Sequence, residues 1–172
     1  HFLDSILPSF DVPLKGSFCD VGAGAGFPSI PLKIVYPDLK ITIVETLGKR
    51  ITFLNALCEK LELKDVECVH ARAEEYAKDH REYFDIVSAR AVANLTMLSE
   101  LCIPLVKIGG IFLSLKGANA QEEYDKAKKA ISLLGCKEKQ RDEKHLSDGS
   151  CRVNFVFEKI KPTPKKYPRM FS

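Results

Sequence analysis

The sequence contains no run of eighteen apolar residues, no Cys-x-x-Cys pair and no histidines at metal-ligand spacing. A transmembrane helix needs about 20 consecutive apolar residues, so the first absence argues against a membrane protein. The other two argue against a metal site. The six cysteines fall mostly in apolar stretches, which indicates buried thiols in a reducing compartment. We therefore expect a cytoplasmic protein.

The composition of the 172 residues, 45% hydrophobic and 28% charged, is ordinary for a globular protein. This length predicts one domain over residues 1–172. The net charge of +3 indicates no partner by itself, but residues 159–172 contain five basic residues, three prolines and no acidic residue. Apolar residues recur at helical spacing over residues 1–10, which we expect to be the end of a helical segment that begins before His1.

A glycine-rich turn within residues 18–27 organises the rest of the chain. A strand pattern precedes it, a helix pattern follows, and glycines at alternate positions allow a ligand to approach the backbone closely. Dinucleotide-binding folds require Gly-x-Gly-x-x-Gly, but here Phe27 stands where the last glycine is needed. With Asp20 in front, the pattern resembles motif I of the methyltransferases that use S-adenosylmethionine, and predicts that Gly22 and Gly24 bind this cofactor. A glycine turn without a ligand is the alternative.

Strand and helix patterns alternate along the chain, which predicts an α/β fold with a mostly parallel sheet and helices on both faces. We expect strands at 16–21, 40–45, 66–70, 84–88, 111–115, 136–144 and 151–160, and helices at 28–36, 47–62, 71–75, 94–105 and 119–134. A turn signal at residues 147–150 predicts that the last two strands form an antiparallel hairpin. Five βα units and a terminal hairpin match the seven-stranded methyltransferase fold.

Candidate binding residues follow the predicted strands, because ligands bind at the carboxyl ends of parallel strands. Glu45 ends the second strand, and a carboxylate there can accept hydrogen bonds from both ribose hydroxyls; a helix-start acid is the alternative. Glu74, Arg90 and Lys116 follow the third, fourth and fifth strands. From the residues alone, a helix-start acid is the alternative for Glu74, a surface ion pair for Arg90 and a solvated loop lysine for Lys116.

Six motifs lie in the same order as in a known family, at residues 1–5, 20–28, 47–50, 88–91, 115–117 and 162–169. The chain thereby resembles the RsmG (glucose-inhibited division protein B) family of bacterial 16S rRNA guanine-N7 methyltransferases. Leu-Gly-Lys-Arg at 47–50 and the proline-rich basic tail are the most specific of these motifs. The chain departs from the family in having Glu45 where aspartate is usual, and Met170 and Phe171 where a basic and a small residue are more frequent.

The resemblance implies a Rossmann-like class I methyltransferase fold, a protein without a metal ion and a partner in 16S rRNA. It also implies which residues contact S-adenosylmethionine: Gly22, Phe27, Ala73, Glu74 and Arg90. The basic residues expected to contact the RNA are Lys49, Lys116, Lys165, Lys166 and Arg169. We further expect the protein to be a monomer.

The implied reaction is methyl transfer from S-adenosylmethionine to N7 of one guanine in the decoding-region loop of 16S rRNA. Guanine N7 carries a free lone pair, so no proton has to be removed before attack. We therefore assign no catalytic acid or base, and expect catalysis to come from alignment and exclusion of solvent. A small-molecule methyltransferase is the closest alternative; a nucleotide-dependent oxidoreductase and an RNA-binding protein with a vestigial cofactor fold are two others.

Overall fold

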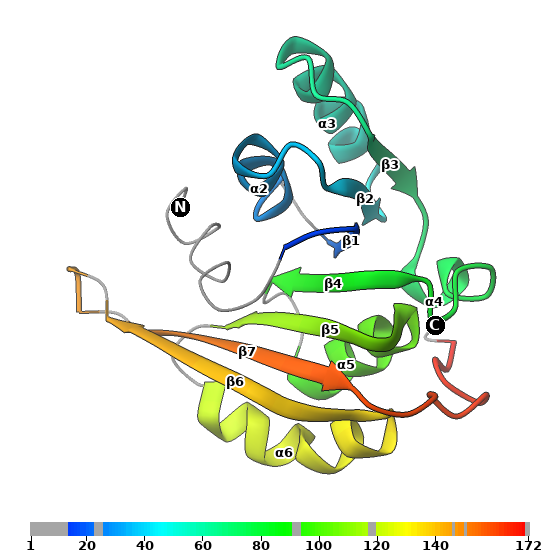
Figure 1. Cartoon of the computed structure of the whole chain (residues 1–172), viewed down its shortest axis with the longest axis vertical. Helices are drawn as coiled ribbons and strands as arrows, with labels where there is room; N and C mark the ends of the chain where they lie inside the picture. Colours follow the sequence, from blue (N-terminus) through cyan, green and yellow to red (C-terminus); the bar gives the residue numbers. More distant parts are fainter. Residues whose placement is uncertain are drawn as a thin grey trace.

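The computed structural model describes residues 14–22, 26–90, 94–116, 120–145, 147–149 and 151–170. Its centre is a seven-stranded sheet with the strand order β3-β2-β1-β4-β5-β7-β6 (Figure 1). The strands are β1 (Ser17–Val21), β2 (Lys40–Glu45), β3 (Val66–His70), β4 (Phe84–Arg90), β5 (Val106–Lys116), β6 (Cys136–His145) and β7 (Cys151–Lys159). The first five strands are parallel, whereas β7 is antiparallel to both β5 and β6. This confirms the predicted sheet with a terminal hairpin.

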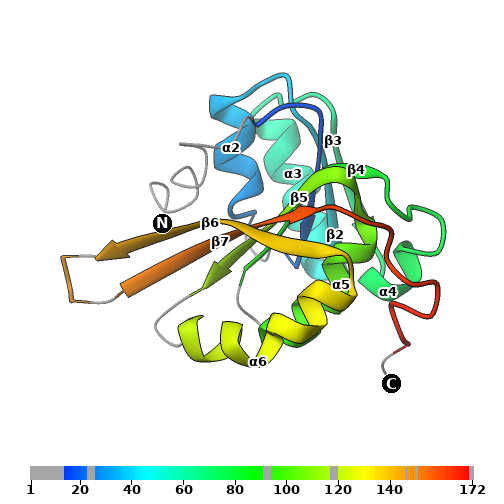
Figure 2. The same cartoon turned by 60° about the horizontal axis from the view of Figure 1, so that its bottom comes forward.

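Helices cover both faces of the sheet, as the alternating pattern predicts (Figure 2). They are α2 (Ser29–Val35), α3 (Gly48–Lys60), α4 (Ala73–Tyr76), α5 (Leu95–Cys102), the 3₁₀ helix η2 (Ile103–Leu105) and α6 (Ala120–Leu133). Helices α2 and α3 pack on one face, and α4, α5 and α6 on the other. The predicted helical segment at residues 1–10 lies outside the described residues.

Two hydrophobic clusters, one on each face of the sheet, form the core. Neighbouring residues of a strand point to opposite faces, so Phe18 joins the cluster beneath α2 and α3 and Cys19 joins the cluster beneath α4–α6. Ile111 and Phe112 divide in the same way on β5. Because both faces are covered, the central strands β1 and β4 are buried at consecutive rather than alternate positions.

Two predicted boundaries, the start of β5 and the end of α5, differ from the structure by three residues or more. Strand β5 begins at Val106 rather than residue 111, because Gly109, with φ of 88°, and Gly110 lie inside the strand at a register irregularity beside β4. The helix expected at 94–105 ends at Cys102, just before Pro104, and continues as η2.

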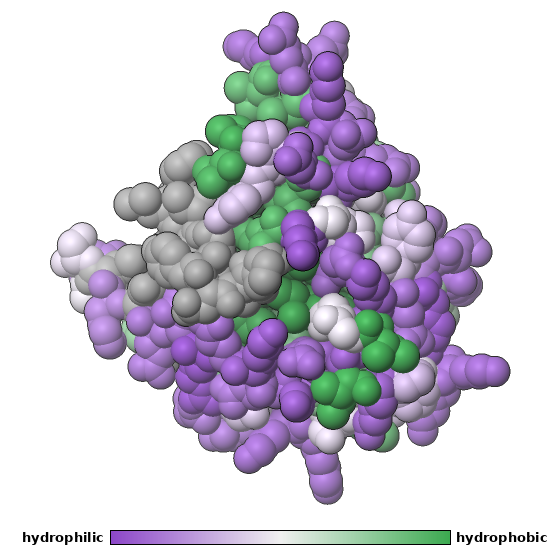
Figure 3. Space-filling view, in the orientation of Figure 1, coloured by the Kyte–Doolittle hydropathy of each residue, from purple (hydrophilic) through white to green (hydrophobic). Residues whose placement is uncertain are grey.

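The apolar stripe predicted for α3 is only half buried. Leu54 and Cys58 are buried, whereas Leu47 and Leu61 at the ends of the stripe are exposed. Ile34 of α2 is also about half exposed. Figure 3 shows hydrophobic residues gathered over this part of the molecule, while hydrophilic residues predominate over the lower part of the view. The cluster on the α4–α6 face is accordingly the larger part of the core.

Candidate cofactor site and basic strap

A cavity of about 360 Å³ opens where β1 and β2 end. The residues that line it include Gly22, Glu45, Ala73 and Glu74, together with apolar residues of α5 such as Met97. The structure therefore brings together four of the seven predicted cofactor residues. Phe27 and Arg90, both half-buried, are not among the residues that line this cavity, and Gly24 lies outside the described residues.

The glycine turn requires glycine at two described positions. Gly22 has φ of 70° and its N–H donates to the carbonyl of Val44 at 2.9 Å, which ties the turn to the neighbouring strand. Gly26 has φ of 99°, and a Cβ there would lie 2.7 Å from Cγ1 of Ile30. Side chains are disfavoured by both backbone conformations, so the backbone itself faces the cavity at Gly22.

Glu45 is 3% exposed and its carboxylate is held in place by the turn that follows it. Its Oε1 accepts hydrogen bonds from the N–H of Thr46 at 3.0 Å and of Leu47 at 3.3 Å. Its Oε2 lies 3.5 Å from Nη1 of Arg50. The alternative role, a capping or first-turn acid of α3, is wrong: the N-cap residue is Leu47 and the first turn of α3 contains no acid. Glu45 instead binds the turn before the helix, which orients its carboxylate at the edge of the cavity. A role in ribose binding stays a prediction.

Glu74 is also buried at the cavity, in the first turn of α4, and Nε of Arg72 lies 3.1 Å from its Oε1. Both Arg50 and Arg72 line the cavity. Sequence reasoning assigned neither to the cofactor site. The available signal was their position: each lies within a few residues of a strand end and of the acid with which it pairs.

Asp20 lies beneath the turn and is fully buried. Its Oδ2 accepts a hydrogen bond from the N–H of Ser29 at 3.3 Å, which connects β1 to the start of α2. Its Oδ1 has no hydrogen-bond partner in the described part of the chain. Burial raises the pKa of Asp20 to about 7, although the Ser29 hydrogen bonds oppose this shift. The motif's acid therefore supports the turn from below and does not line the cavity.

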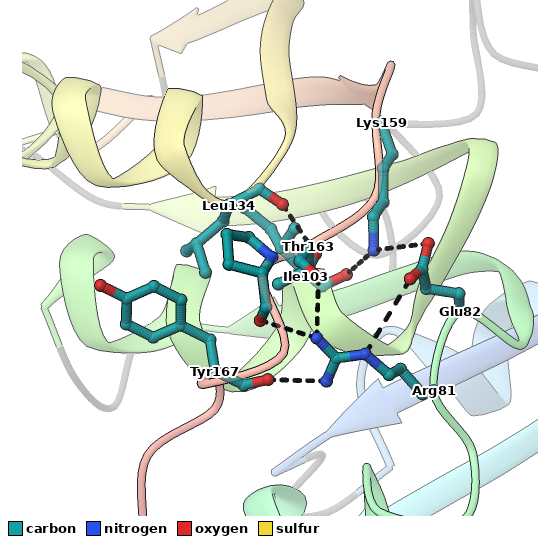
Figure 4. A network of polar contacts seen from close by, with 8 residues as sticks. Arg81, Glu82, Ile103, Leu134, Lys159, Thr163 and Tyr167 are labelled. Atoms are coloured by element: carbon teal, nitrogen blue, oxygen red, sulfur yellow. Dashed lines mark hydrogen bonds and ion pairs between the residues drawn. The ribbon is translucent and has the colours of Figure 1, made fainter.

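Residues 160–170, which we call the strap, are bound to the domain through Arg81 (Figure 4). Arg81 donates from Nη1 to the carbonyl of Tyr167 at 2.6 Å, and from Nη2 to those of Thr163 at 2.9 Å and Pro164 at 2.8 Å. Thr163 Oγ1 donates to the carbonyl of Leu134 at 2.7 Å. The alternative of a solvated, disordered end is wrong for these residues.

Arg169 of the strap is bonded to Glu100 of α5. Its Nε and Nη2 lie 2.8 and 2.9 Å from the two carboxylate oxygens, and its backbone N–H donates to Oε1 at 3.0 Å. The hydrogen bonds from Arg169 lower the pKa of Glu100. The basic segment contains no acid, as its sequence shows, but this acid comes from 69 residues earlier in the chain.

The other residues predicted to contact RNA are divided between two places. Lys49 is exposed at the start of α3, next to the cofactor cavity. Lys165 and Lys166 are exposed on the strap, and Nζ of Lys166 lies 5.3 Å from the centre of the Tyr167 ring. The side chain of Lys116 lies outside the described residues. Whether any of these lysines contacts RNA stays a prediction.

Three further features bear on possible sites in the described residues: groups of metal ligands, membrane-spanning helices and cysteines. Within the described ranges, no group of three or more His, Cys, Asp or Glu residues could hold a metal ion, and no helix is long and apolar enough to cross a membrane. All six cysteines are free; four are buried, and Cys68 and Cys151 are half-buried.

Comparisons with known proteins give the family of this chain. The family model for rRNA small subunit methyltransferase G (GidB) matches residues 1–151. A ribosomal RNA small subunit methyltransferase G from Lysinibacillus sphaericus is 54% identical, over 98% of this chain and 73% of its own length.

Solved structures resemble the chain at lower identity. A 16S rRNA (adenine(1408)-N(1))-methyltransferase from Catenulisporales acidiphilia has a TM-score of 0.69 and 12% identity, over 85% of this chain and 86% of its own. Aeropyrum pernix fibrillarin, solved with bound S-adenosyl-L-methionine, has a TM-score of 0.67 and 17% identity, over 89% of this chain and 72% of its own. At such identities these two structures show the shared fold.

Proposed function

Because the chain belongs to the rRNA small subunit methyltransferase G (GidB) family, we propose that it transfers a methyl group from S-adenosylmethionine to N7 of a guanine in 16S rRNA. The observation that carries this proposal is the cavity at the carboxyl ends of β1 and β2, which Gly22, Glu45, Ala73 and Glu74 line together. These residues come from three separate segments, and the family resemblance assigns most of them to the cofactor. Residues 1–172 act as one methyltransferase domain.

The donor groups of the cavity fit the cofactor. The fixed carboxylate of Glu45 is an acceptor for ribose hydroxyls, and charge-assisted hydrogen bonds of this kind are stronger than neutral ones. Ala73 and the apolar residues of α5 provide a surface for the adenine ring. Gly22 lets the backbone approach the ligand without a Cβ. When bound, S-adenosylmethionine supplies a methyl group activated by the sulfonium charge.

The chain's own residues then bind the two substrates, orient them and exclude water from between them. Guanine N7 is unprotonated at neutral pH, so no described residue has to act as a base in the transfer step. Alignment of the acceptor with the methyl group can account for a large part of the rate, because effective molarities in well-oriented reactions are high. The basic strap and Lys49 favour an RNA over a small molecule as the acceptor. The protein acts as a cytoplasmic monomer.

The test is a methyl-transfer assay with labelled S-adenosylmethionine and small-subunit rRNA, followed by mapping of the modified base. We expect label at one guanine, and strand cleavage at that guanine after reduction and aniline treatment, which detects N7-methylguanine. Under single-turnover conditions the transfer rate should be independent of pH from about neutral to mildly alkaline. Binding of NAD instead of S-adenosylmethionine, or labelling of small molecules but not of RNA, would contradict the proposal.

A further inference from the structure

A groove of about 320 Å³ lies between α4 and the strap, next to the cofactor cavity. Lys78, Arg81 and Lys165 line it with their three positive charges, and Glu74 forms its border with the cofactor cavity. We propose that this groove binds a backbone phosphate of the substrate RNA, with Lys78 and Lys165 as the contacting residues and Arg81 as a positioning residue. The inference rests on the proposed function, because it places the RNA relative to the methyl donor.

The two lysines of the groove are not neutralised by any neighbouring acid that the structure describes. Lys78 and Lys165 are exposed, and neither forms an ion pair with any acid in the described ranges. Beneath them, Glu82 is shared by two cations: its Oε1 lies 3.9 Å from Nε of Arg81, and its Oε2 lies 3.7 Å from Nζ of the buried Lys159. Glu74, the acid at the border, already pairs with Arg72. The groove therefore has a net positive charge and suits an anion.

The position of the groove favours a polynucleotide over a small anion. The lysines stand on two exposed elements, the turn after α4 and the strap, so they can contact a phosphate that remains partly in solvent. Glu74 lines both the groove and the cofactor cavity, which places the two side by side. An RNA strand that fills the groove thus passes the methyl donor. Exposed lysines that contact phosphates release counterions, and this term dominates the affinity of such strands.

The strap is held in place before RNA arrives. Arg81 uses both terminal nitrogens on three strap carbonyls, so its guanidinium is committed to the strap and positions Lys165. Arg169 is likewise committed to Glu100. We therefore assign Arg169 to holding the strap, and add Lys78, which sequence reasoning missed, to the residues that contact RNA. A preformed strap loses less conformational entropy on binding than a disordered end would.

The test compares a Lys78→Ala/Lys165→Ala variant with a matched control, Lys60→Ala/Lys64→Ala. The control removes two equally exposed lysines at and beyond the far end of α3. RNA affinity is measured at a series of salt concentrations, and S-adenosylmethionine affinity by calorimetry. Each lost phosphate contact lowers the salt slope by about 0.7–0.9, so the groove variant should lose up to about two units of slope. The control should keep the wild-type slope, and both variants should bind the cofactor normally.

The outcomes separate this inference from the proposed function. If the wild type methylates rRNA but the groove variant keeps its salt slope, or the control loses as much, the groove inference is overturned and the proposed function stands. If the wild type methylates no rRNA, the proposed function itself fails. A site for a small anion is distinguished by letting inorganic phosphate compete with RNA for the wild-type protein in the absence of cofactor. If the wild type bound phosphate as tightly as RNA, the assignment to a polynucleotide would be overturned.

Arg81→Lys tests positioning, because it keeps the charge and loses the forked contact to the strap. We expect a several-fold higher KM for RNA, an unchanged kcat at saturating RNA, and little additional loss when Lys165→Ala is combined with it. A fall in kcat with an unchanged KM would overturn the positioning role. If Arg81→Lys does not fold, Lys165→Ala alone, measured against Lys64→Ala, tests the groove with an expected slope loss of about one unit.

Discussion

Two carboxyl groups, Asp20 beneath the glycine turn and Glu100 beneath the strap, are held in opposite electrostatic settings. Asp20 is fully buried, accepts a hydrogen bond of 3.3 Å from Ser29, and burial raises its pKa to about 7. Glu100 accepts three hydrogen bonds from Arg169, which lower its pKa. The first carboxyl favours its neutral form in the folded protein, and the second favours its ionised form.

The two settings distinguish the region next to the cofactor cavity from the region where polar contacts fix the strap. At the turn, Gly22 and Gly26 have positive φ, and one oxygen of the buried Asp20 beneath them has no hydrogen-bond partner in the described part of the chain. Features of this kind cost stability and persist at functional sites. At the strap, donors and acceptors are matched and the backbone is fixed by Arg81. Changes at the turn should therefore affect the cofactor, and changes at the strap should affect RNA binding.

The largest effect should come from Gly22→Val. A β-branched residue at a φ of 70° is strained by about 1–3 kcal/mol, and here its side chain would also stand at the edge of the cavity. We expect S-adenosylmethionine binding to be undetectable by calorimetry while RNA affinity is kept. Gly149→Val is the matched control, because Gly149 also has positive φ, at 85°, but a Cβ there meets nothing within 4 Å. Equal loss of cofactor binding in the two variants would contradict this prediction.

A smaller effect on the same ligand should follow from Glu45→Ala. Loss of charge-assisted hydrogen bonds to the ribose should weaken cofactor binding by about 1.5–3 kcal/mol. Because Glu45 also accepts hydrogen bonds from Thr46 and Leu47, thermal unfolding must be measured as well. Glu45→Gln keeps an acceptor for that turn and loses the charge, so it should show intermediate affinity. Glu59→Ala, an exposed position on α3, should change neither quantity. Unchanged cofactor affinity in Glu45→Ala would show that this residue only holds the turn before α3.

The buried carboxyl should give the turn a recognisable pH dependence. Asp20 has a pKa of about 7 in the folded state against an ordinary value of 3.8, so the folded protein binds more protons than the unfolded chain between these values. Stability should therefore fall as pH rises from about 4 to 7, by at most about 1.4 kcal/mol per pH unit from this group. Asp20→Asn should remove this decline in denaturant unfolding curves, whereas Asp38→Asn, at an exposed turn, should retain it. A decline of equal steepness in Asp20→Asn would show that other groups cause it.

The cofactor half of the molecule was more predictable from the sequence than the strap. Strand patterns, the glycine spacing and the acids that follow strands are all local features, and parallel strands bring their ends to one edge. Gly22 and Glu45 were predicted for this reason, whereas Glu74 was assigned to the cofactor by the family resemblance. Arg50 and Arg72 were missed as cavity residues, since nothing local distinguishes an arginine that pairs with a buried acid from one on the surface.

The strap depends on contacts between distant segments, which no local pattern records. Arg81 reaches Tyr167, 86 residues away, and Glu100 meets Arg169 across 69 residues. The sequence showed only a basic, proline-rich end, and that composition suits both a disordered tail and a fixed one. Whether the tail is disordered or fixed depends on the direction that the chain takes after β7, rather than on composition. That direction follows from the pairing of β7 with β5.

The smallest effect should come from Glu100→Gln, which weakens one attachment of the strap and leaves Arg81 in place. Because the folded-state pKa of Glu100 is lowered from 4.5, its contribution to stability is present above that value and is lost as pH falls below it. At neutral pH we expect a small decrease in thermal stability, faster proteolysis of the strap and unchanged cofactor affinity. Glu122→Gln on α6 removes an exposed acid that pairs with Lys126 and should change none of these. Only below the lowered folded-state pKa of Glu100 should the wild type and Glu100→Gln become alike, since the wild-type carboxyl is then protonated as well. A difference in strap proteolysis that persists at that pH would show that the carboxyl group holds the strap by its shape and hydrogen bonds rather than by its charge.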